Sequence, residues 1–363
     1  MNGNRIKNAI GNFILIILVL LIGGIVVYAF KTEIFNNNQE IVEYEEGSHT
    51  ITTKLPEDGE SKTDIISIEP SNKATISNTT NIDKFYYNQL DIYSKKIYDA
   101  LYYNKENLKT GTAKIDLDTD LAKFLTNKEN ESKVEGIFTI AITAFECDNP
   151  DVFYVDFSKI ILYYESNGFG KSNAYIQSGD EGSYLIDGFN NKEDVEMAEN
   201  QINTIVEGIK SNTNGSGDYI KVKYIHDWIV KNTKYDMSLS KENRNNIYGL
   251  FIEKDVTCGG YANAFKYLMD QVGIDSIVVQ GEASKDGNTE YHAWNYVKVD
   301  NTWYAIDCTW DDPIVEGVSE ENKKIYYEYF LKGTNSFNNH ARFNTFYGTD
   351  LKIIYPDLSI QNY

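Results

Sequence analysis

The sequence predicts an α+β protein in which a buried helix packs on an antiparallel sheet. Apolar residues recur at the i, i+3 and i+4 spacing of a buried helix in the segment 258–272, which a glycine ends. The next three segments, 276–283, 291–299 and 302–308, are rich in Val, Ile, Tyr and Trp and are typical of strands. Because only two residues separate the last two strands, we expect them to pair as a hairpin.

The region before this helix also mixes helices with strands, and its 81–195 part carries no chemical motif. Periodic apolar patterns mark its elements. The predicted helices are 83–101, 134–147, 192–210 and 218–232, and the predicted strands are 152–155 and 160–164. We interpret 81–195 as an accessory domain that packs on the rest of the chain or positions a substrate.

The N-terminal segment 9–30 is predicted to be a transmembrane helix. It carries no charged residue, and at about 1.5 Å per residue it can cross a hydrocarbon core of about 30 Å. Arg5 and Lys7 precede it, so the positive-inside rule places the tail 1–8 in the cytoplasm and the remaining chain outside. The alternative interpretation is a signal peptide that is cleaved after Ala29.

The composition excludes some classes of partner. The formal net charge of −20 opposes binding to phosphate backbones, so we expect no nucleic acid. The three cysteines form no CxxC motif and no cluster with zinc spacing, so we expect neither a metal nor another cofactor. Buried free thiols are the usual state of scattered cysteines, and the alternative is a Cys147–Cys308 disulfide that leaves Cys258 free.

Cys258 lies where a thiolate is favoured. Thr257 before it is a good N-cap, so Cys258 opens the helix, where the dipole and unpaired N–H groups stabilise an anion. Gly259 and Gly260 are expected to leave room for a backbone or substrate to approach.

The predicted hairpin brings a histidine and an aspartate together. Asp300 and Asn301 both tolerate the left-handed conformation of a two-residue turn. This register pairs Val299 with Thr302 and places His292 diagonal to Asp307 on one sheet face. Asp307 can then hold one nitrogen of His292 and favour its charged form, as the third member of a catalytic triad does.

Each of these residues also has a structural interpretation. A cysteine that opens a helix is commonly a core thiol, and an aspartate near a strand end commonly forms a turn. We expect His226 to form hydrogen bonds within the core, and we assign His340 no role. Trp294 and Trp310 are candidates for the walls of a substrate cleft, with core packing as the alternative.

Three segments together resemble the core of the transglutaminase-like superfamily. They are CGGYA at 258–262, HAWN at 292–295 and DCTWDDP at 307–313. The similarity covers about residues 200–335 and implies a papain-type fold with a Cys-His-Asp triad. It implies Cys258 as the nucleophile, His292 as general base and acid, and Asp307 as the residue that orients His292.

The sequence patterns and the resemblance together divide the chain into five parts. They are a cytoplasmic tail at 1–8, a transmembrane helix at 9–30, an acidic flexible linker at 31–80, an accessory domain at 81–195 and a transglutaminase-like catalytic domain at 196–363. The expected reaction is attack of Cys258 on an amide, followed by release of the thioester to water or to an amine. A bacterial cell surface favours a peptidase or amidase that acts on protein or cell-wall peptide. The alternatives are a cross-linking transglutaminase and a non-catalytic surface-binding module, which would need no intact triad.

Overall fold

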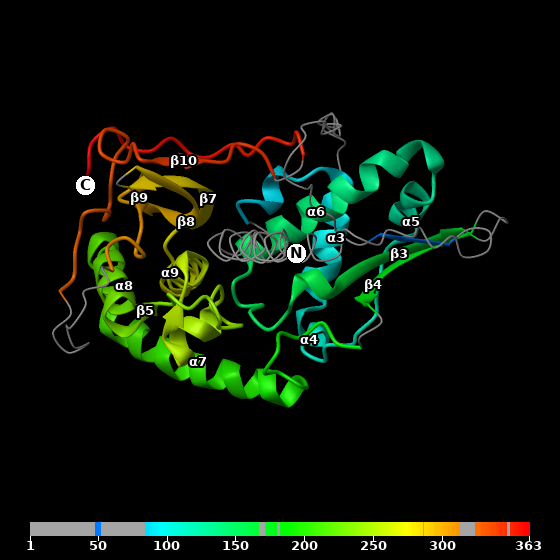
Figure 1. Ribbon diagram of the computed structural model, residues 1–363, viewed down its shortest axis with the longest axis horizontal. Helices are drawn as coiled ribbons and strands as arrows, with labels where there is room; N and C mark the ends of the chain where they lie inside the picture. Colours follow the sequence, from blue (N-terminus) through cyan, green and yellow to red (C-terminus); the bar gives the residue numbers. More distant parts are fainter. Residues whose placement is uncertain are drawn as a thin grey trace, which may run out of the picture. The chain divides into compact units, whose positions relative to one another are not determined.

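The computed structural model describes residues 48–51, 84–166, 171–179, 182–285, 287–312, 324–346 and 349–363. Helices and antiparallel sheets alternate in it, as predicted (Figure 1). The described residues form two compact units. The N-terminal unit contains 48–51, the described part of 84–205, and Phe343–Pro356; the C-terminal unit contains the described part of Val206–Arg342 together with Asp357–Tyr363.

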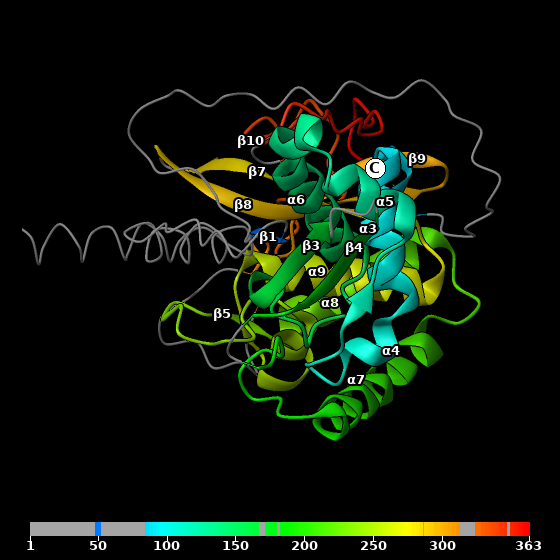
Figure 2. The same cartoon turned by 90° about the vertical axis from the view of Figure 1, so that its right-hand side faces the viewer.

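The N-terminal unit combines helices with an antiparallel sheet in the order β1-β3-β4-β2. Its strands are β1 (Ser48–Ile51), β2 (Ile115–Asp116), β3 (Ile160–Ser166) and β4 (Ser172–Ser178). Its helices are η1 (Tyr87–Gln89), α3 (Ile92–Tyr103), α4 (Lys105–Leu108), α5 (Thr119–Leu125), η2 (Lys128–Asn130), α6 (Glu131–Asp148) and η3 (Phe157–Lys159). Helices α3 and α6 pack side by side, as both views show (Figures 1 and 2).

Several elements of this unit differ from the prediction. The predicted helix 83–101 is the short η1 followed by α3, with Leu90 extended between them. Val152–Val155 is not a strand: its side chains are buried, but only Val155 forms a bridge, to Leu185. A short apolar run does not reveal its conformation by periodicity, and here it forms turns. Strand β1 lies inside the predicted flexible linker 31–80 and pairs with β3.

The segment Phe343–Pro356 lies in the N-terminal unit, although we predicted that 196–363 forms one domain. Aromatic side chains attach it. The Tyr355 hydroxyl lies 3.1 Å from the Tyr86 hydroxyl, and the Phe346 ring packs edge-on against Tyr86 at 5.9 Å. Contacts between residues this far apart in sequence leave no local pattern, so the prediction could not contain them.

Helix α7 (Lys192–Thr213) contains both the predicted domain boundary at 195/196 and the observed one at 205/206. The C-terminal unit continues from it. Its further elements are α8 (Asp218–Asn232), β5 (Lys234–Tyr235), the π-helix η4 (Gly249–Glu253), β6 (Asp255–Val256), α9 (Cys258–Val272), β7 (Ser276–Lys285), β8 (Asn288–Val299), β9 (Thr302–Ile306) and β10 (His340–Arg342).

The antiparallel sheet of this unit has the order β10-β7-β8-β9, and α9 packs against β7 and β8 (Figure 1). The predicted hairpin register is confirmed: Val299 pairs with Thr302, and Asn295 pairs with Ile306. Asp300 and Asn301 have φ values of 48° and 64°, the left-handed conformation that the two-residue turn requires. The expected helix on an antiparallel sheet is therefore present.

Gly281 allows β10 to join this sheet. A Cβ atom at this position would overlap the Ala341 carbonyl oxygen and lie 2.7 Å from the Trp294 ring. In the register of β10 with β7, Gly281 is the partner of Arg342 and Ala283 is the partner of His340. A side chain at 281 would therefore push β10 away and displace His340.

The predicted transmembrane helix at 9–30 lies outside the described residues, as does most of the predicted linker. Within the described ranges, no helix combines the length and the apolar character needed to cross a membrane.

Candidate active site

Cys258 is the first residue of α9, as predicted, but Thr257 does not cap the helix with its side chain. The Thr257 hydroxyl instead donates to the side-chain oxygen of Asn245, and its backbone N–H donates to the Arg244 carbonyl at 2.8 Å. The expected N-cap bond is thus replaced by a tertiary contact. The helix still begins at Cys258, so its N-terminal dipole acts on the thiol.

Gly259 and Gly260 make room for the loop that precedes α9 rather than for a substrate. A Cβ atom at Gly260 would lie 2.6 Å from the Arg244 carbonyl oxygen and 2.5 Å from the Cβ of Val256. At Gly259 it would lie 3.1 Å from the Asn245 side-chain oxygen. The two glycines therefore allow the preceding loop to fix the start of α9.

The Cys258 side chain is buried at the junction of α9 with the sheet. It belongs to a cluster with Ala262 on α9, Val278 on β7 and Ala293 on β8, and only 2% of the residue is exposed. The next residue along β8 from Ala293 toward the N-terminus is His292. Packing of α9 on β7 and β8 thus places the thiol against β8, the strand that carries His292.

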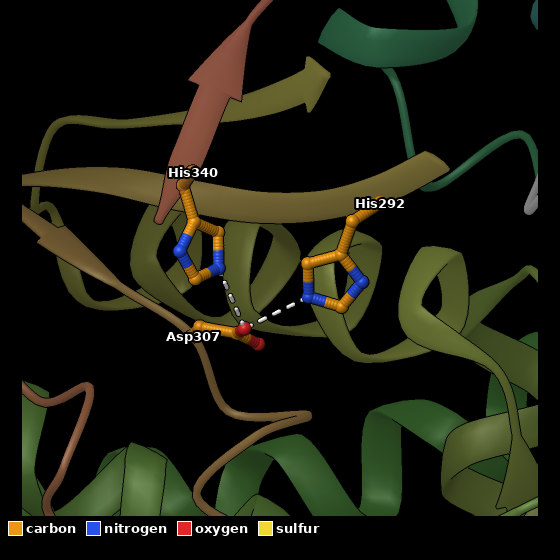
Figure 3. A group of neighbouring side chains, drawn as sticks. All are labelled: His292, Asp307 and His340. Carbon is orange, nitrogen blue, oxygen red and sulfur yellow. Dashed lines mark hydrogen bonds and ion pairs between the residues drawn. The ribbon is translucent and has the colours of Figure 1, made fainter. Parts of the chain in front are cut away.

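His292 and Asp307 form the pair that the hairpin register predicts. Nε2 of His292 lies 2.8 Å from Oδ2 of Asp307, from β8 to the end of β9 (Figure 3). The second ring nitrogen points away from Asp307 (Figure 3). Cys258 also acts on the His292 ring closely enough to help raise its pKa. The structure thus brings the three predicted residues into one cluster, and their catalytic roles stay a prediction.

Asp307 is an ionised carboxylate although it is only 1% exposed. Its Oδ1 accepts hydrogen bonds from the backbone N–H groups of Thr309 at 2.9 Å and Trp310 at 3.2 Å. Burial alone would raise the pKa of Asp307, but the charge and hydrogen bond of His292, aided by His340, lower it well below its usual range. A negative charge is therefore held next to His292.

This charge keeps His292 protonated. Burial alone would lower the pKa of His292, but Asp307, through its charge and its hydrogen bond, and Cys258 together raise it to about 10. At neutral pH the ring is an imidazolium with one N–H directed at Asp307. Its other N–H is available to the thiol.

His340, to which we assigned no role, is a fourth member of the cluster. Its Nε2 lies 3.2 Å from the same Oδ2 of Asp307 (Figure 3). It lies on β10, which pairs with β7, and no local sequence signal marks this pairing. The prediction therefore had no means to place it.

Tyr235 is a second residue that the prediction missed. Strand β5 pairs in parallel with β6, and Tyr235 is opposite Val256, two residues before Cys258. Burial raises the pKa of Tyr235 most, and the charge of Cys258 raises it further. Its hydroxyl is thus a proton donor within electrostatic reach of the thiol.

The two predicted cleft tryptophans surround the His292 ring. Trp310 stacks on it at 5.1 Å between ring centroids and is half-buried. Trp294 lies 6.2 Å from it and is only 1% exposed, with its indole Nε1 buried and without a hydrogen-bond partner among the described residues. Contact with a substrate stays a prediction for both, and their observed contacts hold the imidazole in place.

His226 forms hydrogen bonds within the core, as predicted. Its Nδ1 lies 3.1 Å from Asp227 and its Nε2 lies 3.1 Å from Asp311, and the side chain has no exposure. Burial alone would lower the pKa of His226, but these two carboxylates raise it. Both ring nitrogens are occupied, which leaves none for catalysis.

Among the described residues, one group of side chains has the spacing of metal ligands. His292, Asp307 and His340 each offer a ligand atom, and these atoms lie within 4.8 Å of one another. The same atoms already form the two hydrogen bonds to Oδ2, which account for the arrangement without an ion. All three cysteines are free and buried.

The comparisons with known proteins give matches to part of the chain. Residues 203–308 match the transglutaminase-like superfamily. Kyphoscoliosis peptidase of Homo sapiens is 24% identical over 125 residues, a match that covers 31% of this chain and 19% of that protein. The Mus musculus protein matches equally. The chain thus matches about a fifth of the length of these relatives.

Two solved structures are similar to parts of the chain at low scores. A TGase crystal structure is 16% identical, with a TM-score of 0.29, and the match covers 45% of this chain and 48% of that one. The periplasmic domain of TgpA from Pseudomonas aeruginosa is 13% identical, with a TM-score of 0.24, and the match covers 39% of this chain and 55% of that one. Residues 203–308, which include Cys258, His292 and Asp307, are a transglutaminase-like core.

Proposed function

We propose that the protein is a thiol hydrolase or acyltransferase that cleaves peptide or side-chain amides through a thioester at Cys258. One observation carries this proposal. Nε2 of His292 lies 2.8 Å from the ionised Asp307, and Cys258 acts on the same ring closely enough to help raise its pKa. This is the arrangement by which a base activates a nucleophile and a carboxylate orients the base.

The proposed reaction begins from a thiolate–imidazolium pair. Sγ of Cys258 attacks the amide carbon, and the carbonyl π electrons move to the oxygen. N–H groups at the start of α9 stabilise that oxyanion, and the Tyr235 hydroxyl is a second candidate donor. His292 gives its proton to the amine nitrogen as the C–N bond breaks. Water then gives a proton to His292 and attacks the thioester, which releases the acid and restores the pair.

Hydrolysis is the outcome that we favour. The match of the core to kyphoscoliosis peptidase supports it, with protein or cell-wall peptide as the proposed substrate. Transfer to an amine would give cross-linking instead and shares every step up to the thioester. Cell envelopes incubated with a fluorescent primary amine separate the two: release of amine-free peptide indicates hydrolysis, and fluorescent adducts indicate transfer.

Thiol labelling tests the nucleophile. Burial raises the pKa of Cys147 and of Cys308 well above the usual thiol range, so both should resist alkylation. We expect iodoacetamide at pH 6 to label Cys258 well before the other two, and Cys258→Ala to abolish this early labelling. Equal rates at all three, rising only near the ordinary thiol pKa of about 8.5, would contradict the proposal.

We also propose that the protein is a single-pass membrane protein with its C-terminal part at the bacterial cell surface. The charge-free run at 9–30 and the preceding Arg5 and Lys7 support this location. Protease treatment of intact cells should remove the chain beyond about residue 80 and leave a short membrane fragment. A secreted form that begins at Phe30 would show that the segment is a cleaved signal peptide.

A further inference from the structure

Two histidines from different strands share one oxygen of Asp307. Nε2 of His292 on β8 lies 2.8 Å from Oδ2, and Nε2 of His340 on β10 lies 3.2 Å from the same atom (Figure 3). A triad needs only the first contact. The second therefore requires an explanation.

The His340 ring is held firmly in this position. It stacks on Phe337 with 4.0 Å between centroids and 20° between planes, and the Trp310 and Trp294 rings lie at 4.6 Å and 4.9 Å. The side chain has no exposure to solvent. A polar ring in such apolar surroundings is stable only when its nitrogens have partners.

The hydrogen bonds determine the protonation of His340. Nδ1 lies 2.9 Å from the Oδ1 end of the Asn339 amide, whose other end lies 3.2 Å from the Tyr329 hydroxyl. A doubly protonated ring would place a second cation beside the His292 imidazolium in a buried site. Burial, reinforced by the His292 charge, lowers the pKa of His340 despite Asp307. The ring is thus neutral, with its proton on Nε2.

A neutral ring also sets the direction of the neighbouring bonds. Nδ1 of His340 must accept, so the amide nitrogen of Asn339 is its partner, since an amide end is assigned from its hydrogen bonds. The Asn339 oxygen then accepts from the Tyr329 hydroxyl. Every donor in the chain from Tyr329 through Asn339 and His340 points toward Asp307.

We propose that His340 is a positioning residue that donates Nε2–H to Asp307, keeps this carboxylate ionised and limits how tightly it holds the proton of His292. With His340 present, Asp307 accepts four donors: two backbone N–H groups and two imidazoles. Each donor that shares Oδ2 makes this oxygen less basic. A less basic Asp307 leaves His292 better able to give its proton to a leaving amine, so this consequence rests on the proposed function.

Other ionisable groups near the pair come from several elements. They are Cys258 on α9, Tyr235 on β5, Lys285 on β7, Glu290 on β8, and Tyr329 and Asp311 in the segments that follow β9. None of these groups forms a hydrogen bond with Oδ2 of Asp307, the oxygen that both histidines share. Removal of the His340 donor is therefore the direct way to test the inference.

The experiment measures ring protonation by NMR of the full chain with ¹⁵N-labelled histidine. The chain contains only four histidines, so single substitutions assign the spectrum. In His340→Phe, which retains stacking but has no donor, we expect the titration midpoint of His292 to rise by about half a unit to one unit. In the matched control His340→Gln, whose amide N–H replaces Nε2–H, the midpoint should return to that of the unsubstituted protein.

An unchanged or lower His292 midpoint in folded His340→Phe overturns the inference. If this variant does not fold, the unsubstituted protein decides: a neutral His340 with its proton on Nε2 supports the inference, and a charged ring at pH 7 overturns it. A His340 signal that changes on addition of EDTA would indicate a bridging metal and also overturns it. Failure of Cys258 labelling would refute the proposed function alone, because the histidine titrations are read without a substrate.

Discussion

Two buried histidine–carboxylate clusters lie in the C-terminal unit, and only one of them is suited to catalysis. The active-site cluster consists of Cys258, His292, Asp307 and His340; the clamp consists of His226, Asp227 and Asp311. Each histidine lies about as close to its carboxylates, at 2.8 Å for His292 and 3.1 Å for both contacts of His226. The pKa of each imidazole is raised by these carboxylates against the effect of burial.

The difference lies in the second ring nitrogen. His226 uses both nitrogens on carboxylates, whereas His292 uses one on Asp307 and has the other turned away from it (Figure 3). A histidine held on both sides cannot exchange a proton with a substrate. The number of occupied ring nitrogens, rather than burial or charge, therefore separates a candidate base from a histidine with a structural role.

The clamp has its own structural role. Oδ2 of Asp311 forms a hydrogen bond with Nε2 of His226. Oδ1 of Asp311 accepts a hydrogen bond from the backbone N–H of Tyr329 at 2.8 Å. It thereby ties helix α8 to the turn that follows β9. The same turn supplies the two backbone N–H groups that bind Asp307, so the clamp supports the active-site cluster indirectly.

The sharpest test of this comparison replaces each histidine in turn by glutamine. His292→Gln should lower turnover by about a thousandfold or more, because no acid or base remains. His226→Gln should leave turnover within about threefold but lower the free energy of unfolding by about 2–4 kcal/mol, since a buried carboxylate loses its partner. Turnover and denaturant unfolding measure the two effects. Equal loss of turnover in both variants would remove the distinction between base and clamp.

Replacing the two aspartates by asparagine should give a smaller contrast. Asp307→Asn should lower turnover by about tenfold to a thousandfold, less than in a serine triad because the thiolate–imidazolium pair of a cysteine enzyme is already partly formed at rest. Its melting temperature should change by only a few degrees. Asp311→Asn should mainly lower the melting temperature. If Asp307→Asn leaves turnover intact while His292→Gln abolishes it, Asp307 does not orient the histidine.

The smallest expected effect is a pH dependence of stability that the clamp controls. The folded pKa of His226 is raised, so its contribution to stability is complete below the unfolded histidine pKa of about 6.5 and is lost as the pH rises through the folded pKa. The difference in unfolding free energy between the unsubstituted protein and His226→Gln should therefore be largest at pH 6 and decrease at higher pH. Urea unfolding at several pH values measures it; a difference that grows with pH would contradict a charged clamp.

The sequence by itself determined the three central residues of the active-site cluster. Helical periodicity located the start of α9 at Cys258, and a two-residue turn at Asp300 and Asn301 set the register of His292 against Asp307. These features depend on residues close together in the chain. Local backbone preferences and the alternation of side chains along a strand are sufficient to predict them.

The tertiary structure decided everything that depends on distant pairing. His340 joins the cluster because β10 pairs with β7 beside Gly281, and Tyr235 approaches Cys258 through the pairing of β5 with β6. Thr257 was expected to cap α9, but its hydroxyl binds Asn245 instead. In each case a partner distant in sequence, brought close only by folding, outweighs the local preference. Local patterns therefore predicted the start of α9 at Cys258 and the pairing of His292 with Asp307, and packing of the folded chain determined what surrounds them.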